Sequence, residues 1–241
     1  MNYIEKDNID EVTEGIVLSY LKEKAADITC VDIEGIIEDF FKLPIRYEKF
    51  AEDDPNTDGY ISDGITPLMV WVNGKPIKKL FAKGTIIIDD YLNDYQNNHH
   101  RRFSLAHECS HYISHILYNT LLGVNHTGFD KERTYTMDEL RKQFSITEAQ
   151  MNTMAAALLM PKFLLDKTMK QFTNGEPIVI YGNSVLLKDD VDILKAMSKQ
   201  LGVSMTALRI RLIKCNYLLQ RPIEEFIENM KEVSELCHDC Q

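Results

Sequence analysis

Apolar side chains recur every three or four residues near the start of the chain, which is the spacing that buries one face of a helix. This pattern predicts a first helix around residues 16–25 and a second around 33–40, which Pro44 ends. Shorter apolar runs follow, separated by turns that contain glycine, and they indicate strands at 45–50, 60–62, 68–72 and 85–88. The first ninety residues therefore predict two helices and a small antiparallel sheet.

Helical spacing returns in the rest of the chain. A broad apolar stripe predicts a helix at 98–119, and the polar stretch 123–141 is expected to form a loop. Ser145 has the position of an N-cap for a long helix over 146–160, and Pro161 is expected to begin the next helix. Further on, the pattern predicts a loop or hairpin and then two amphipathic helices, at 172–187, 191–201 and 204–213.

The order of these elements predicts an α+β fold. We expect a core over residues 1–187 and a helical extension over 188–241 that contains a helix-turn-helix-like segment and packs on the core. The 241 residues include 37 acidic side chains against 27 Lys and Arg, so the formal net charge is -10. That charge argues against a nucleic-acid partner, although a local basic face can still bind one.

Localisation and redox state follow from what the sequence contains. No stretch is long and apolar enough to cross a bilayer, and the N-terminus lacks the pattern of a signal peptide, so we expect a cytoplasmic protein without a membrane partner. The five cysteines are scattered and are expected to be reduced thiols. Cys237 and Cys240 form an isolated CxxC pair, whereas a closed structural zinc site needs a second pair of ligands.

The chemistry centres on the run His107-Glu108-Cys109-Ser110-His111. Residues four apart lie on one face of a helix, so His107 and His111 can direct imidazole nitrogens at one metal ion. Zinc in such a site lowers the pKa of a bound water, and Glu108, about 100° around the helix from His107, is predicted to accept its proton during peptide-bond hydrolysis. The alternative is a helix whose histidines merely face solvent or the core.

A catalytic zinc needs a third protein ligand and one open position. His115 continues the spacing of the two histidines but lies too far along a straight helix to join them. Glu148 is the best-placed downstream residue, with Asn152 one turn later to hold its carboxylate. The alternative is that Glu148 closes a capping box with Ser145. The other downstream candidates are His126, Glu132, Asp138 and Glu139.

Two segments carry a resemblance to known proteins. Residues 102–112 read RFSLAHECSHY, and residues 148–152 read EAQMN and run into the LLMP of 158–161. They resemble the RFxxAHExxH helix and the ExxxN…LLMP helix of the ImmA/IrrE family of metallopeptidases. The order of elements is similar over roughly residues 10–215, and Cys109 and Ser110 replace the Leu-Gly pair that usually follows the glutamate.

The resemblance implies a zincin-like fold, in which a small twisted antiparallel sheet packs on the active-site helix. It implies His107, His111 and Glu148 as Zn2+ ligands and Glu108 as the catalytic base. It further implies an intracellular endopeptidase whose protein substrate is a helix-turn-helix repressor of a mobile element or a stress response.

Other functions remain open at this point. In the segment 196–212 and just beyond it, Arg209, Arg211 and Lys214 can face a DNA groove, but two helices packed over a catalytic face need the same apolar pattern. A DNA-binding or protein-interaction regulator with a metal site and no proteolytic activity is the alternative function. For a peptidase, an exposed sheet edge at 85–88 or 60–62 is expected to hold the substrate by strand addition.

Overall fold

The computed structural model describes residues 6–22, 27–51, 58–120, 122–123, 137–182 and 185–228. The chain divides into two compact units, the first comprising Met1–Lys162 with Leu201–Val203 and the second Phe163–Gln200 with Ser204–Gln241. The first change of unit falls earlier than residue 187, where the sequence placed the boundary. Strand β6 (Ile178–Tyr181) lies with the C-terminal helices because it pairs with β7 (Leu218–Arg221).

The two predicted N-terminal helices are both present. Helix α1 spans Lys6–Leu21. Helix α2 spans Ile33–Gly35 and runs directly into a π-helical turn, η2, at Ile36–Phe40. The Asp32 carboxylate accepts a hydrogen bond from the Gly35 amide at 3.0 Å, which satisfies a free N–H at the start of α2.

A three-stranded sheet has the order β1-β5-β2, formed by Ile45–Glu48, Ile86–Asp89 and Gly59–Ile61 respectively. Strand β2 is antiparallel to β5, but β1 is parallel to it, so the prediction of a wholly antiparallel sheet was wrong. The long segment between β1 and β5 leaves room for the crossover that a parallel pair requires.

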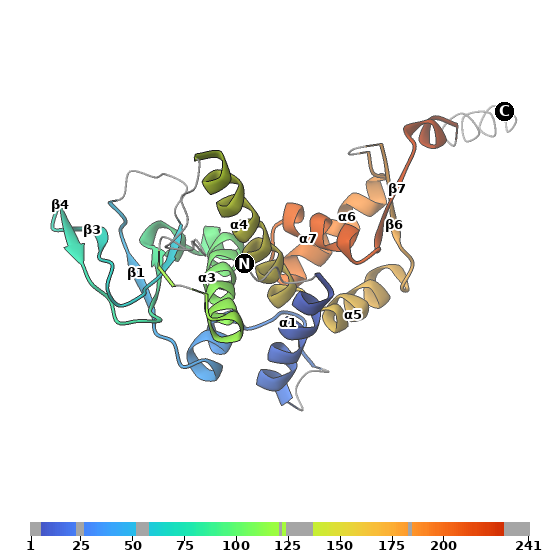
Figure 1. Cartoon of the computed structure of the whole chain (residues 1–241). Coiled ribbons are helices and arrows are strands. Elements are labelled where there is room, and N and C mark those ends of the chain that lie inside the picture. Colours follow the sequence, from blue (N-terminus) through green and yellow to red (C-terminus); the bar gives the residue numbers. More distant parts are fainter. Residues whose placement is uncertain are drawn as a thin grey trace, which may run out of the picture. The chain divides into compact units, whose positions relative to one another are not determined.

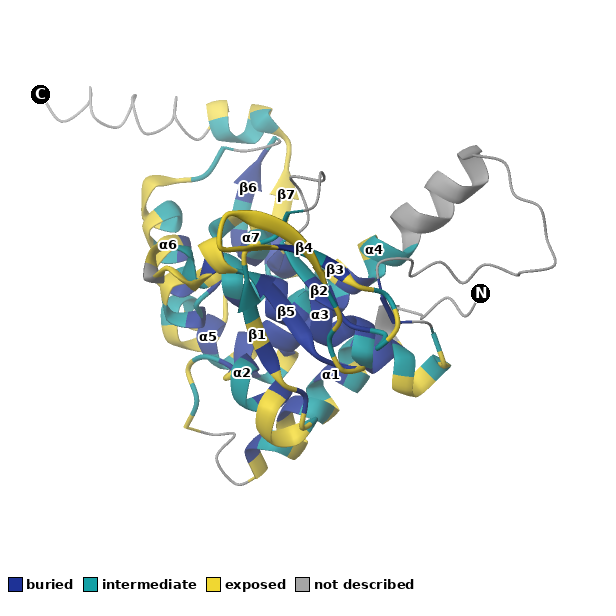
Figure 2. Cartoon of the chain, turned by 90° about the vertical axis from the view of Figure 1, so that its left-hand side faces the viewer, coloured by how far each residue is buried: buried dark blue, intermediate teal, exposed yellow. Residues whose placement is uncertain are grey.

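The central place of β5 also corrects one of the two candidate sheet edges. Its residues Ile86, Ile87 and Ile88 are buried on both faces, and Figure 2 shows β5 in dark blue. A continuous apolar run is typical of a strand that is covered on both faces. Residues 85–88 therefore cannot offer an edge, whereas β2 is an edge of this sheet, as the sequence suggested for 60–62.

A separate hairpin consists of β3 (Leu68–Val72) and β4 (Lys75–Lys79). Asn73 and Gly74 form its two-residue turn, and both have positive φ, 51° and 76°. Strand β4 was missed in the sequence because its lysines and proline hide the alternation of a strand, although the Asn-Gly turn signalled a hairpin. Leu68 and Val70 pack with Tyr60 and Ile87 of the three-stranded sheet.

Helix α3 (Asn98–Tyr118) follows two short 3-10 turns, η3 (Asp90–Asn93) and η4 (Tyr95–Asn97). It packs against β2, β5 and α4 (Met137–Leu159). Figure 1 shows α3 beside α4. Helix α4 begins nine residues before the predicted start at 146, so the end of the expected loop 123–141 is helical. Residues 124–136 of that loop lie outside the described residues.

In the second unit, α5 (Lys162–Thr173), α6 (Lys188–Leu201) and α7 (Met205–Lys214) lie where helices were predicted. The hairpin predicted as one option for 172–187 is not the main pairing there, because β6 pairs in parallel with β7. Residues 223–228 are helical, and Cys237 and Cys240 fall outside the described residues. Within the described part of the chain, no helix combines the length and the apolar character needed to cross a bilayer.

Candidate metal centre

The two histidines of the motif lie one turn apart on α3 and point to the same place. Their Nε2 atoms are 3.1 Å apart. His111 is almost fully buried, and the side chain of His107 is 17% exposed. Helical geometry alone produces this convergence, because residues i and i+4 share one face.

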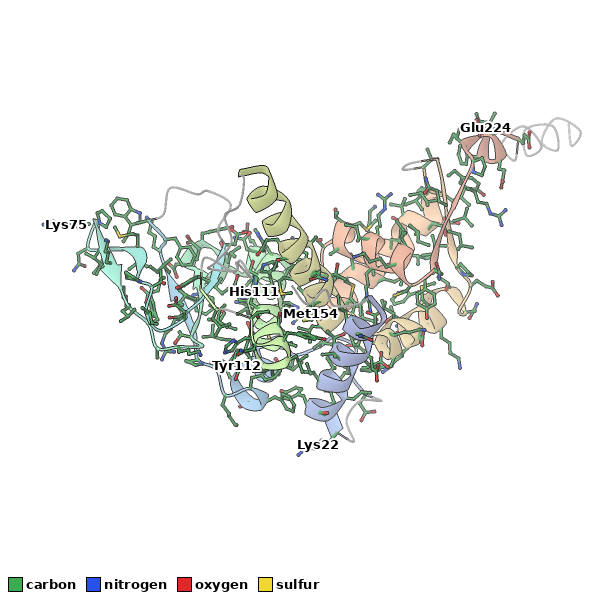
Figure 3. All side chains as sticks on the ribbon, in the orientation of Figure 1. Lys22, Lys75, His111, Tyr112, Met154 and Glu224 are labelled. Atoms are coloured by element: carbon green, nitrogen blue, oxygen red, sulfur yellow. The ribbon has the colours of Figure 1, made fainter. Side chains whose placement is uncertain are left out.

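Glu148 comes from the neighbouring helix α4 and completes the cluster. Its Oε2 atom is 3.1 Å from His107 Nε2, and its Oε1 atom is 3.7 Å from His111 Nε2. Among the described residues, these three form the one group of His, Cys, Asp and Glu side chains whose ligand atoms all lie within 4.8 Å of one another. Figure 3 labels His111 on α3 and Met154 on α4, the two helices that supply the group.

The donor set fits a catalytic divalent metal ion. Two imidazole nitrogens and one carboxylate oxygen are a ligand set of hydrolytic zinc enzymes, in which a fourth position stays open. Three lone-pair donors brought this close together repel one another unless a cation or shared protons lie between them. The capping-box alternative for Glu148 is wrong, since α4 begins at Met137 and position 145 is inside the helix.

Asn152 supports the cluster, but through a different residue from the one expected. Its Oδ1 atom is 3.0 Å from Nδ1 of His107, whereas the sequence suggested that Asn152 holds the Glu148 carboxylate. In this arrangement His107 Nδ1–H donates to the amide oxygen, which leaves the Nε2 lone pair free for a metal. Asn152 therefore selects the tautomer and the orientation of the His107 ring.

Glu108 lies beside the cluster and is 7% exposed. Burial is the largest cause that raises the pKa of its carboxyl to about 7. The nearby Glu148 acts in the same direction, and His107 and the backbone N–H of Ile61, which donates to the carboxylate, oppose the shift. A general base works best when its pKa is close to the working pH. Its position next to the histidines and its pKa both suit proton transfer at the metal.

Gly59 of β2 is a residue of this site that the sequence analysis missed. A Cβ atom at this position would lie 3.0 Å from Cγ and 3.0 Å from Oε1 of Glu108. Strand β2 therefore approaches Glu108 as closely as it does only because residue 59 has no side chain. In the sequence, Gly59 was interpreted as part of a turn between Pro55 and Gly59.

Replacing Gly59 with alanine is expected to lower kcat about tenfold, because the added methyl group displaces the Glu108 carboxylate by a few tenths of an ångström. Metal content is expected to be unchanged, since the atoms nearest to a Cβ at this position belong to Glu108 and Ile88 and not to a proposed ligand. Steady-state kinetics and metal analysis check both points. Gly15→Ala in α1 is the matched control, because nothing lies within 4 Å of a Cβ there. An unchanged kcat in Gly59→Ala would contradict this role.

The raised pKa of Glu108 also predicts how stability depends on pH in the metal-free protein. The folded-state pKa of about 7 lies above the ordinary value of 4.5, so the unfolded chain releases the proton more readily. The contribution of the protonated Glu108 carboxyl to the free energy of unfolding is complete below about pH 4.5, and it is lost as the pH rises through about 7. Between pH 5 and pH 8, wild type is expected to lose about 2 kcal/mol relative to Glu108→Gln in urea unfolding. If the free energy of unfolding depended on pH equally in the two proteins, the raised pKa of Glu108 would be contradicted.

The remaining chemical candidates lie elsewhere. His115 Nδ1 donates to the Thr120 carbonyl at the end of α3, away from the cluster. Cys109 is fully buried, as expected, and burial raises the pKa of its thiol, so it belongs to the core. His126 and Glu132 lie outside the described residues, and Asp138 and Glu139 are in the first turn of α4.

Comparison with known families agrees with this geometry. The family model of peptidase M78, described as the IrrE N-terminal-like domain, matches residues 90–212, just over half of the 241-residue chain. The chain belongs to this family of metallopeptidases. The match runs from η3 to α7 and includes both helices of the cluster, and membership confirms the α+β, zincin-like fold class predicted from the sequence. No curated protein matches the chain.

The helix-turn-helix-like segment of this M78 chain corresponds to α6 and α7. Arg211, one of the three basic residues that were expected to face DNA, is 2% exposed. Ile210 and Ile213 are exposed on α7 instead, at 48% and 51%. A helix that reads a groove presents polar and basic side chains there, so α7 is poorly suited to DNA.

Proposed function

We propose that this M78 protein is a cytoplasmic zinc-dependent endopeptidase that cleaves a protein, specifically a helix-turn-helix repressor of a mobile element or a stress response. One observation carries the proposal: two histidines of α3 and one glutamate of α4 converge beside a buried glutamate. Membership of a metallopeptidase family supports the reaction class. The repressor substrate and the cytoplasmic location rest on the resemblance of the two motifs to the ImmA/IrrE family.

Each residue of the site has a distinct part in the proposed reaction. His107, His111 and Glu148 hold the metal, and Asn152 keeps His107 in the tautomer that leaves Nε2 available. A divalent metal bound there polarises a carbonyl and lowers the pKa of water. Glu108 takes the proton of the attacking water at its carboxylate and then donates it to the leaving amine.

Strand β2 is the proposed support for the peptide substrate. The carbonyl of Asp58 accepts from Asp89 N at 3.0 Å, and Ser62 N donates to Thr85 O at 2.9 Å, so both residues direct these groups at β5. Successive residues of a strand alternate, and the backbone groups of Gly59 and Ile61 therefore point away from β5. A peptide added along this edge would pass directly beside Glu108.

Co-expression tests the function. The chain is expressed with candidate repressors encoded near its own gene, as wild type and as Glu108→Gln, and repressor fragments are identified by mass spectrometry. We expect a defined cut with wild type and an intact repressor with the variant. A repressor that co-purifies uncut with both proteins would instead support the silent interaction regulator, and equal cleavage by both proteins would contradict the proposed chemistry.

A further inference from the structure

The β3–β4 hairpin differs in charge from the rest of the protein. Residues 64–88 contain four lysines and no acidic residue, whereas the whole chain has a formal net charge of -10. Three of the lysines, Lys75, Lys78 and Lys79, are on β4. Lys79 forms a salt bridge with Glu48, and its ammonium group lies over the ring of Phe81. Lys75 and Lys78 are exposed. The hairpin is therefore a locally basic element of an acidic protein.

One face of the hairpin places two lysines, Lys49 and Lys78, beside a tryptophan. Trp71 lies opposite Pro76 of β4, and the bridge between Phe50 and Val70 places Lys49 opposite Trp71 on its other side. The backbone N–H of Trp71 donates a hydrogen bond to the backbone carbonyl of Lys49 at 2.8 Å, which fixes this register. Side chains directly opposite one another share a face of the sheet. Lys49, Trp71 and Pro76 thus form one row, with Lys78 diagonal to Trp71.

Large apolar side chains are exposed around this row. On the face of Trp71, the Trp71 side chain is 42% exposed and Leu80, directly after β4, is 58% exposed. Val72 and Ile77, at 37% and 41%, lie on the other face, since they are opposite Lys75 and Val70. Figure 3 shows Lys75 at the tip of the hairpin. We call Lys49, Trp71, Pro76 and Lys78, together with Leu80 directly after β4, the hairpin patch. Lysine and proline on an edge strand protect it against aggregation, but that role does not account for an exposed Trp flanked by aliphatic side chains.

We propose that the hairpin patch is a docking surface for an acidic segment of a protein substrate in which carboxylates alternate with apolar side chains. Lys49 and Lys78 complement the carboxylates, and Trp71 and Leu80 complement the apolar side chains. Tryptophan at the centre of such a surface typically supplies much of the binding energy. That the bound protein is a substrate rests on the proposed function. The positive charge and the exposed apolar surface of the patch are observed independently of the proposed function.

Two features define how the segment is recognised. Pro76 has no N–H, so the outer edge of β4 is poorly suited to strand addition, and recognition falls to side chains. The single tryptophan and the aliphatic neighbours fit a peptide better than a nucleic acid, which needs several aromatic side chains for stacking.

The patch and the metal centre lie on opposite sides of the three-stranded sheet. Tyr60 and Ile87 are paired and pack against Leu68 and Val70 of the hairpin. Gly59, the neighbour of Tyr60, faces Glu108 of α3, because successive side chains of a strand alternate. Substitutions in the patch are therefore expected to leave the cluster of His107, His111 and Glu148 unchanged.

Trp71 is the only tryptophan of the chain, so its fluorescence reports on the patch without background. The metal-free 241-residue protein is titrated with a peptide of about 14 residues in which Glu and Leu alternate, flanked by Gly-Ser. We expect a blue shift of the emission, protection from acrylamide and weakening by salt. The same peptide with Lys in place of Glu is expected to have no effect. Equal shifts with both peptides, or no shift with either, would overturn the proposal.

Charge reversal supplies the matched variants. Lys49→Glu/Lys78→Glu is expected to weaken binding about tenfold or more, whereas Lys162→Glu/Lys170→Glu changes the net charge equally on α5 and is expected to bind as wild type. A shift produced only by oligo-dT or only by phosphatidylglycerol vesicles would overturn the proposal in favour of a nucleic acid or a membrane.

The outcome is separable from that of the proposed function, because binding to metal-free protein needs no catalysis. Peptide binding by a protein that cleaves nothing would leave the patch standing and refute the peptidase assignment. Once a protein substrate that the enzyme cleaves has been found, the charge-reversal variant of the patch is expected to raise KM for that substrate and leave kcat unchanged. A fall in kcat at unchanged KM would contradict docking.

Discussion

Replacing Glu108 with glutamine is expected to lower kcat about a thousandfold while the metal stays bound. The amide keeps the size of the side chain but cannot accept the proton of the attacking water, and general-base catalysis contributes about 10²- to 10⁴-fold. The proposed ligands His107, His111 and Glu148 are untouched, so metal content should remain at the wild-type level. Cleavage of a repressor partner, followed by gel and mass spectrometry, measures the rate.

Glu38→Gln is the matched control for this variant. Glu38 is exposed on η2, outside the cluster, and the chemical change is identical. Full activity is expected from the control. If Glu108→Gln cleaves at the wild-type rate, another group must take the proton, and the proposed mechanism is wrong.

Replacing Glu148 with alanine is expected to weaken metal binding by at least about a hundredfold. The residue supplies the one carboxylate of the cluster, and even an outer partner of a metal ligand typically contributes 10- to 100-fold to affinity. Asn152→Ala, which removes only the partner of His107 Nδ1, is expected to have a smaller effect on the same scale. Competition with a fluorescent chelator measures both affinities.

The same pair of variants distinguishes a ligand from a structural residue. A structural role for Glu148 would lower the melting temperature of the metal-free protein and leave the metal affinity unchanged. That result would remove Glu148 from the site and leave the two histidines without a third described ligand.

Much of the site could be predicted from the sequence because its geometry is local. The spacing of His107 and His111 determines their convergence on any straight helix, and Glu148 and Asn152 share a face of the next helix for the same reason. Which partner Asn152 contacts depends on the packing of α4 against α3, and no spacing along the chain encodes that. Gly59 was missed because its role exists only where β2 crosses Glu108.

For the fold too, features that depend on neighbouring residues were predicted, and features that depend on residues distant in the sequence were not. Short apolar runs marked most strands, but whether β1 and β5 run parallel depends on a crossover between distant segments. The capping pattern at Ser145 obscured the true start of α4, although Met137, Leu140 and Phe144 continue the helical spacing upstream. A local cap signal was thus given more weight than the longer periodicity.

X-ray absorption spectroscopy of the zinc-loaded protein tests the central claim most directly, namely that His107, His111 and Glu148 form the metal centre. Nitrogen and oxygen ligands at about 2.0–2.1 Å, with an imidazole contribution and no sulfur, are the predicted result. A sulfur shell at about 2.3 Å would place the metal on cysteines such as Cys237 and Cys240 instead, and would contradict the account.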